Sequence, residues 1–253
     1  MLGELGLGGG TLLVIVACFV IAGAVKGTVG IGLPTVAVGL LSQIIDPRLT
    51  VSLVALPIFL TNLYQVWSSG VTLETARRYW VMGAILVVAL WGATFLTASV
   101  SSEVLLGVIG VAVVTFAATN LFLTPPPLPQ RHDRAGQVAA GIGAGVFGGL
   151  TSIWSPPVVT YLIARGTGKD EFVRATGLMF ALGGVPLVLG FWQQGLLDGG
   201  VGRLGALLIL PSIAGFALGE VLRRRLDADR FRKVLLWTFL LLGLNLLRKV
   251  AFG

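Results

Sequence analysis

The 253-residue chain is 55% hydrophobic and 11% charged, whereas a soluble domain carries about 25% charged residues. This composition excludes an ordinary soluble domain and indicates an integral membrane protein. The net charge of +7 does not indicate a nucleic-acid partner, because the basic residues lie in short gaps between apolar runs, where they act as topology signals.

Apolar segments follow one another along the whole chain and predict an all-α membrane protein with about ten transmembrane or re-entrant helical segments. Six have roughly the 20 residues that a helix needs to cross a bilayer. The first two, and the sixth and seventh, are shorter and are separated by Gly or Pro, so each short pair is either two crossings or one re-entrant hairpin. The ten segments are 11–25, 29–45, 49–67, 79–98, 104–123, 137–150, 152–164, 172–192, 203–222 and 233–252.

The segments form two sets of five within a single transmembrane domain, 1–253. Residues 1–123 make the first repeat, the Pro-rich stretch 124–136 is a cytoplasmic linker, and residues 137–253 make the second repeat. An odd number of segments in each half means that the two halves enter the membrane in opposite directions. We therefore expect two inverted repeats, each beginning with a broken helix pair.

Short sequence matches support this duplication. The stretch from Gly27 to Gly30 is similar to that from Gly145 to Gly148, and Arg48-Leu-Thr is similar to Arg174-Ala-Thr. Both matches fall at equivalent places in the two halves.

Basic residues predict the orientation. One set of gaps receives most of the 18 basic residues, while the other receives Arg48, Arg203, Arg248 and Lys249. The positive-inside rule makes the first set cytoplasmic and places both termini outside. The N-terminal segment lacks a basic n-region, so we expect a retained first helix rather than a cleaved signal.

The first broken pair carries the sequence "KGTVGIGLP", residues 26–34. A broken helix exposes backbone N–H groups and a positive dipole end, which suit an anion. Lys26 supplies a positive charge and Thr28 a hydroxyl, while glycines permit close backbone approach. The candidate glycines are Gly27, Gly30 and Gly32.

The second broken pair carries "GGLTSIWSPP", residues 148–157. Its two prolines are suited to starting the next helix. Hydroxyl donors and glycines again occur together, without a carboxylate. The candidate substrate-binding residues here are Gly148, Gly149, Thr151, Ser152 and Ser155.

Each of these residues also has a structural explanation. Membrane glycines commonly permit close helix packing, and hydroxyl side chains bond to their own helix backbone. Lys26 can extend to the cytoplasmic interface instead of contacting an anion. Trp154 is as well explained by an interfacial anchor or by packing as by a pocket wall.

Further polar residues lie within or beside the spans. Asn62 and Gln65 belong to the third segment and Gln193 ends the eighth, so these amides are further candidates for substrate binding. Arg48 and Arg174 begin equivalent segments from opposite sides. We expect them to attract an anion in the outer and inner vestibules, with an interfacial topology signal as the alternative.

Several kinds of chemistry lack the residues they need. No Asp or Glu lies well inside an apolar run, which disfavours transport of a cation. One cysteine, Cys18, and one histidine, His132, do not suffice for a disulfide framework or a zinc site. We therefore expect no metal, no cofactor and no enzymatic activity.

The quoted motifs resemble those of the sulfite exporter TauE/SafE family of bacterial membrane transporters. Residues 22–41, "AGAVKGTVGIGLPTVAVGLL", are similar to the first glycine-rich motif of the family, and residues 145–162, "GVFGGLTSIWSPPVVTYL", to the second. Residues 170–180, "DEFVRATGLMF", are similar to the segment that usually follows. Ser155-Pro-Pro departs from the usual Gly-Pro-Pro, and the first motif lacks a run of three glycines.

The resemblance implies a secondary transporter of a small sulfur-containing anion, such as sulfite or an organosulfonate, in the bacterial inner membrane. The two broken pairs predict alternating access around a site at the midplane. An anion channel, or a transporter of another small organic anion, is the alternative, and a membrane enzyme is less well supported. The expected partners are the anion and membrane lipid, and a homo-oligomer is compatible with the sequence.

Overall fold

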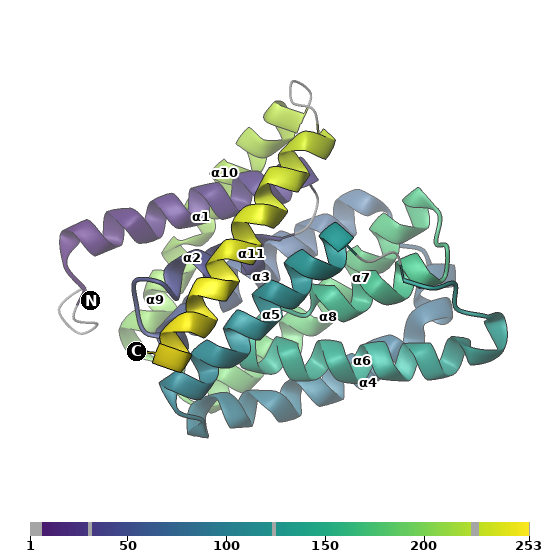
Figure 1. The fold of residues 1–253 in the computed structure, drawn as a ribbon, viewed down its shortest axis with the longest axis horizontal. Helices are drawn as coiled ribbons and strands as arrows, with labels where there is room; N and C mark the ends of the chain where they lie inside the picture. Colours follow the sequence, from purple (N-terminus) through teal and green to yellow (C-terminus); the bar gives the residue numbers. More distant parts are fainter. Residues whose placement is uncertain (1–6, 30–31, 123–124, 224–227, 253) are drawn as a thin grey trace.

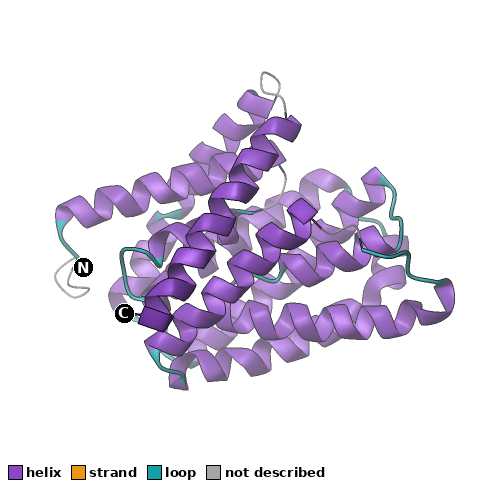
Figure 2. Cartoon of the chain, in the orientation of Figure 1, coloured by secondary structure: helices purple, strands orange, loops and turns teal. Residues whose placement is uncertain are grey.

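A computed structural model describes residues 7–29, 32–122, 125–223 and 228–252, and the regular elements in these ranges are helices (Figure 2). The expected all-α class is therefore confirmed. Gly30 lies outside the described residues. In chain order the helices are α1 (Gly9–Val29), α2 (Leu33–Leu41), α3 (Pro47–Ser69), α4 (Leu73–Ser99), α5 (Ser102–Phe122), the 3-10 turn η2 (Gln130–His132), α6 (Asp133–Thr151), α7 (Ser155–Ala164), α8 (Lys169–Gln193), α9 (Gly199–Leu207), α10 (Ile209–Arg223) and α11 (Ala228–Phe252).

Seven helical stretches in the described part of the chain are long and apolar enough to cross a bilayer. They are α1, α3, α4, α5, α8, the α9–α10 stretch from Gly199 to Leu222, and the part of α11 from Lys233 to Phe252. The chain is thus a multi-pass membrane protein.

Several of the expected segments differ from the structure. The segment 29–45 was too long, since α2 covers only Leu33–Leu41, and 79–98 was too short, since α4 covers Leu73–Ser99. α1 and α6 have 21 and 19 residues, so the segments 11–25 and 137–150 were too short, because charged and polar ends continue both helices. The segment 203–222 is two helices, α9 and α10, that meet at Leu208. α6 begins at Asp133 and so includes the last residues of the expected linker.

The short helices are α2, with 9 residues, and α7, with 10. At about 1.5 Å per residue, neither crosses a bilayer alone. After α2, Gln43 accepts a bond at its backbone oxygen from Lys249 near the end of α11, and after α7, Arg165 pairs with Asp133 at the start of α6. α2 therefore ends at the face where α11 ends, and α7 ends at the face where α6 begins (Figure 1).

Glycines bring two pairs of helices into close contact. A Cβ at Gly23 or Gly27 of α1 would lie 2.2 Å from a backbone oxygen of α10. A Cβ at Gly145 or Gly149 of α6 would lie 2.5 Å from an alanine Cβ of α4. α1 packs along α10 and α6 along α4 because these positions carry no side chain.

α3 and α8 pack against each other in antiparallel directions. Phe59 of α3 lies against Gly184 of α8, and Gln65 lies against Gly177. Between these contacts, Asn62 Nδ2 donates a hydrogen bond of 3.1 Å to the backbone oxygen of Phe180. The interface between α3 and α8 therefore joins the two halves of the chain.

Candidate functional site

The two breaks meet at one small cavity. Gly32 and Pro34 come from the break between α1 and α2, and Trp154 and Ser155 come from the break between α6 and α7. The other lining residues are Lys26, Asn62 and Phe180. The volume open to a water molecule is about 10 Å³, so this conformation has space for about one water.

The first turns of α2 and α7 form two walls of the cavity. Gly32 precedes α2 with φ of 110°, a backbone conformation that glycine adopts without a Cβ clash. Among the described residues, neither helix start has a side-chain cap. Since α2 and α7 both begin at the cavity, the positive ends of two helix dipoles face it.

Lys26 places an amine at this junction. The residue is 3% exposed, and its Nζ donates hydrogen bonds to Asn62 Oδ1 and, over 3.1 Å, to Thr61 Oγ1. The Thr61 hydroxyl donates in turn to the backbone oxygen of Pro57 over 2.8 Å, which holds its oxygen as an acceptor for Lys26. Lys26 is therefore a buried residue of α1, and its side chain does not extend to an interface, which was the alternative explanation.

Two residues that line the cavity carry donors with no hydrogen-bond partner in the described part of the protein. The Ser155 hydroxyl and the Trp154 Nε1 are both buried and unbonded. The Trp154 indole lies against Gly183 and packs edge-on to Phe180, with ring centroids 6.4 Å apart. An unsatisfied buried donor is costly, so these groups suit a site that a ligand completes.

The polar and charged groups around the cavity determine the sign of the ligand that it favours. Among the described residues, no carboxylate lies within ion-pair distance of Lys26. An amine, a free hydroxyl and two helix N-termini all favour negative charge. The polarity of these groups therefore favours an anion over a cation, while the space of about 10 Å³ in this conformation is smaller than an oxyanion.

Several sequence-predicted residues serve helix packing instead. Gly27 lies against Phe216 of α10, and the Thr28 hydroxyl donates to the backbone oxygens of Ala24 and Gly219. Both side-chain positions therefore face α10 and not the cavity.

The same holds at the second break. Gly148 lies between Leu90 and Trp154, and Gly149 lies against α4. The Thr151 hydroxyl bonds the backbone of Phe147 and Ile153, and the Ser152 hydroxyl donates to Val51 of α3. Ser152 has a φ of 59° and ends α6. The hydroxyls of Thr151 and Ser152 thus bond to backbone groups at the break, whereas the Ser155 hydroxyl has no partner among the described residues.

The candidate amides lie in different places. Asn62 lines the cavity, and Gln65 lies one turn further along α3, with its Oε1 buried and unpartnered among the described residues. Gln193 is exposed and accepts a hydrogen bond of 3.0 Å from Trp91 Nε1. Gln193 is therefore not among the residues that line the cavity.

The two arginines lie outside the cavity. Arg48 donates to the backbone oxygens of Thr97 and Val100, 3.3 and 2.5 Å away, and so binds the C-terminal end of α4. Arg174 is half-buried in the second turn of α8. The bonds of Arg48 fit an interfacial structural role, and its part in a vestibule stays a prediction.

Sequence reasoning missed Pro34, Thr61 and Phe180. Pro34 follows Gly32 in the motif and could have been included from that position alone. Thr61 precedes Asn62 in a helix with a proline at 57, but nothing in the sequence shows which face of α3 meets Lys26. Phe180 contributes a ring wall and a backbone acceptor, and neither has a sequence signal.

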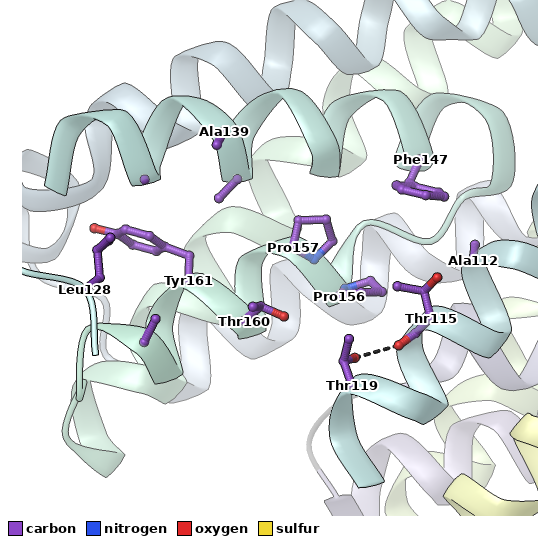
Figure 3. A pocket seen from close by; sticks show the side chains of 13 residues that line it. Ala112, Thr115, Thr119, Leu128, Ala139, Phe147, Pro156, Pro157, Thr160 and Tyr161 are labelled. Carbon is purple, nitrogen blue, oxygen red and sulfur yellow. Dashed lines mark hydrogen bonds between the residues drawn. The ribbon is translucent and has the colours of Figure 1, made fainter. Parts of the chain in front are cut away.

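A larger cavity of about 350 Å³ lies between α5, α6 and α7 (Figure 3). Its walls include Thr115, Pro156, Thr160 and Tyr161, and the Thr119 hydroxyl donates to the backbone oxygen of Thr115 over 2.6 Å. Its described lining residues include no charged side chain. This cavity therefore lacks an amine such as that of Lys26.

An all-helical, multi-pass membrane protein with a buried lysine amine where two helix breaks meet has the features of a membrane transporter. The family model described as sulfite exporter TauE/SafE matches residues 13–246, and the chain belongs to this family. Its members are transporters, not enzymes, so the expectation of no enzymatic activity is confirmed. Searches of the curated proteins and of the solved structures found no match.

Proposed function

We propose that the protein is a secondary transporter of a small sulfur-containing anion, sulfite or an organosulfonate, across the bacterial inner membrane. The anion binds near the midplane, between the two broken helix pairs, and reaches either side by alternating access. The family supports a small transported anion, and the cavity supports where it binds.

The single observation that carries this proposal is the environment of Lys26. Its amine is buried against two neutral acceptors, with no carboxylate partner in the described residues. An unpaired buried charge is strongly unfavourable. A bound anion supplies the missing charge, and Ser155 supplies a further donor beside it.

The packing supports an inverted repeat. If α1 to α5 correspond to α6 to α11, with α9 and α10 together matching α4, then α1 on α10 is the counterpart of α6 on α4. The closely packed glycines agree, since Gly23 and Gly27 face α10 as Gly141 and Gly145 face α4. α3 is antiparallel to its counterpart α8, as an inverted repeat requires.

The faces of the bundle support the proposed orientation. Asp133 and Arg165 lie at one face and Arg48 and Lys249 at the other. Most of the basic residues belong to gaps at the first face, which we assign to the cytoplasm. Both termini are then periplasmic, and the start of α1 and the end of α11 lie on one side (Figure 1).

The closed cavity supports a carrier over an open channel. A space of about 10 Å³ is too small for a hydrated ion. Substrate entry then requires α2 or α7 to move relative to α3 and α8. Such gating of a fixed midplane site is typical of transporters built from inverted repeats.

Flux into proteoliposomes tests the proposal. The wild-type protein should show saturable, counter-transportable uptake of labelled sulfite or an organosulfonate, and Lys26→Ala should reduce it by about tenfold or more. Lys169→Ala, at an exposed position on α8, is the matched control. Unchanged uptake by a correctly inserted Lys26→Ala protein would refute the proposed contact.

A further inference from the structure

We propose that the Lys26 amine takes up a proton when the anion binds and releases it when the anion leaves, so that one proton accompanies each monoanion. This inference rests on the proposed function and adds the coupling ion. It follows from the hydrogen bonds that Lys26 Nζ makes.

The amine has two hydrogen-bond acceptors and one remaining position. Lys26 Nζ donates to Thr61 Oγ1 and to Asn62 Oδ1, and the cavity lies on its remaining side. A neutral amine has two N–H groups and one lone pair. Two acceptors therefore satisfy the neutral form, and a third N–H, if present, needs a partner in the cavity.

The surroundings provide no resident counter-charge. Helices α2, α3, α7 and α8 contribute Pro34, Thr61, Asn62, Trp154, Ser155 and Phe180 around the amine, and none of these side chains carries a charge. On α10, Glu220 is exposed and forms no ion pair with Lys26 in the described structure. The described charged side chains of α11, which touches α1, are Lys233, Arg248 and Lys249, near its two ends.

The protonation state of the amine then depends on whether the cavity holds an anion. With the cavity empty, a buried ammonium without a counter-ion is disfavoured, and a group in this position neutralises. With an anion present, the protonated amine donates its third N–H to the anion in a charge-assisted hydrogen bond.

The balanced step is R–NH₂ + H⁺ + A⁻ giving R–NH₃⁺···A⁻. No covalent bond to the substrate forms, and the proton leaves with the anion on the other side. Transport of a monoanion is therefore electroneutral. Its direction is set by the combined gradients of anion and proton, and not by the membrane potential.

The test uses methanesulfonate, because a sulfonic acid stays a monoanion over the working pH range and carries no proton of its own. The purified full chain is placed in vesicles of phosphatidylethanolamine and phosphatidylglycerol, with potassium and valinomycin holding the membrane potential at zero. Labelled methanesulfonate and a trapped pH dye report the two fluxes together.

For wild type we expect methanesulfonate to acidify the lumen, with about one proton for each anion. With the lumen alkaline, we expect accumulation of about tenfold for each unit of pH difference, since the two gradients balance at that point. Lys26→Arg keeps the charge permanently, because a guanidinium stays protonated. This variant should lose the proton flux and respond to the membrane potential, while Lys169→Arg should match wild type.

The outcomes separate the two proposals. If wild type accumulates methanesulfonate in response to membrane potential and independently of the pH gradient, the proton coupling is wrong and the transport function stands. If neither methanesulfonate nor sulfite enters vesicles that contain folded protein, the proposed function fails, and the coupling fails with it. The wild-type measurement tests the proton coupling even if the Lys26→Arg variant does not fold.

Discussion

At the scale of single residues, the site depends on how two neutral side chains, Thr61 and Asn62, hold the Lys26 amine. Asn62 accepts from Lys26 at Oδ1 and donates at Nδ2 to the backbone oxygen of Phe180. Both ends of this amide are used, so its orientation is fixed. Because Asn62 is neutral, the charge of Lys26 remains available to an anion.

Asn62→Asp should therefore weaken transport in a protein that still folds. The new carboxylate would form a buried ion pair with Lys26, and the substrate would have to compete with it. We expect the apparent affinity for sulfite to fall by about tenfold or more. Gln130→Glu, an exposed amide-to-acid change in η2, is the control, and equal uptake by both variants would contradict this role of Asn62.

The sequence predicts part of this site for a clear physical reason. Lys26, Gly32 and Ser155 occur within helix-breaking motifs, and a break in a membrane helix is visible as Gly, Pro and polar residues among apolar ones. Thr28 occurs in the same motif but faces α10. Which side of a helix meets the cavity is set by tertiary packing, and one sequence alone does not contain that information.

At the scale of elements, the break that follows α1 is held in place by the packing of α1 against α10. α1 carries Lys26, and its position is fixed by contact with α10 at Gly23 and Gly27. The sequence predicts the breaks and makes Gly27 a candidate for the substrate site, whereas in the structure Gly27 packs against α10. A glycine that allows close helix packing and a glycine that allows ligand approach look the same in sequence.

Gly27→Leu should consequently destabilise the protein and not merely weaken binding. A Cβ at this position would lie 2.2 Å from the backbone oxygen of Phe216, which cannot move aside as a side chain can. We expect the free energy of unfolding to fall by about 1–3 kcal/mol. Thermal unfolding in detergent measures this loss. Gly92→Leu is the control, since Gly92 of α4 is exposed and no described residue of another helix lies within 4 Å of its Cβ position. Similar melting of both variants would count against the packing role.

At the scale of the whole molecule, the proposed inverted repeat and the distribution of basic residues are consistent with the same orientation in the membrane. Pairing of α1 with α10 and of α6 with α4 exchanges helices between the halves, so neither half packs independently of the other. The sequence indicates this duplication through weak matches and an odd number of segments. It does not contain the helix pairings, since those depend on contacts between residues far apart in the chain.

Cysteine labelling tests the orientation. In a Cys18→Ser background, which removes the only cysteine, Ser101→Cys lies between α4 and α5 and Gln130→Cys lies in the linker. A membrane-impermeant maleimide should label position 101 from the periplasmic side of intact cells and position 130 only after permeabilisation. The reverse pattern would place both termini in the cytoplasm.

The central claim is that an anion binds at Lys26, where the two helix breaks meet. The most direct measurement is anomalous diffraction at the selenium edge from crystals grown with selenite, a heavier analogue of sulfite. We predict a selenium peak between Lys26 and Ser155, with selenite oxygens about 2.7–3.2 Å from Lys26 Nζ and Ser155 Oγ. Selenium bound elsewhere in the bundle, with none at Lys26, would contradict the account.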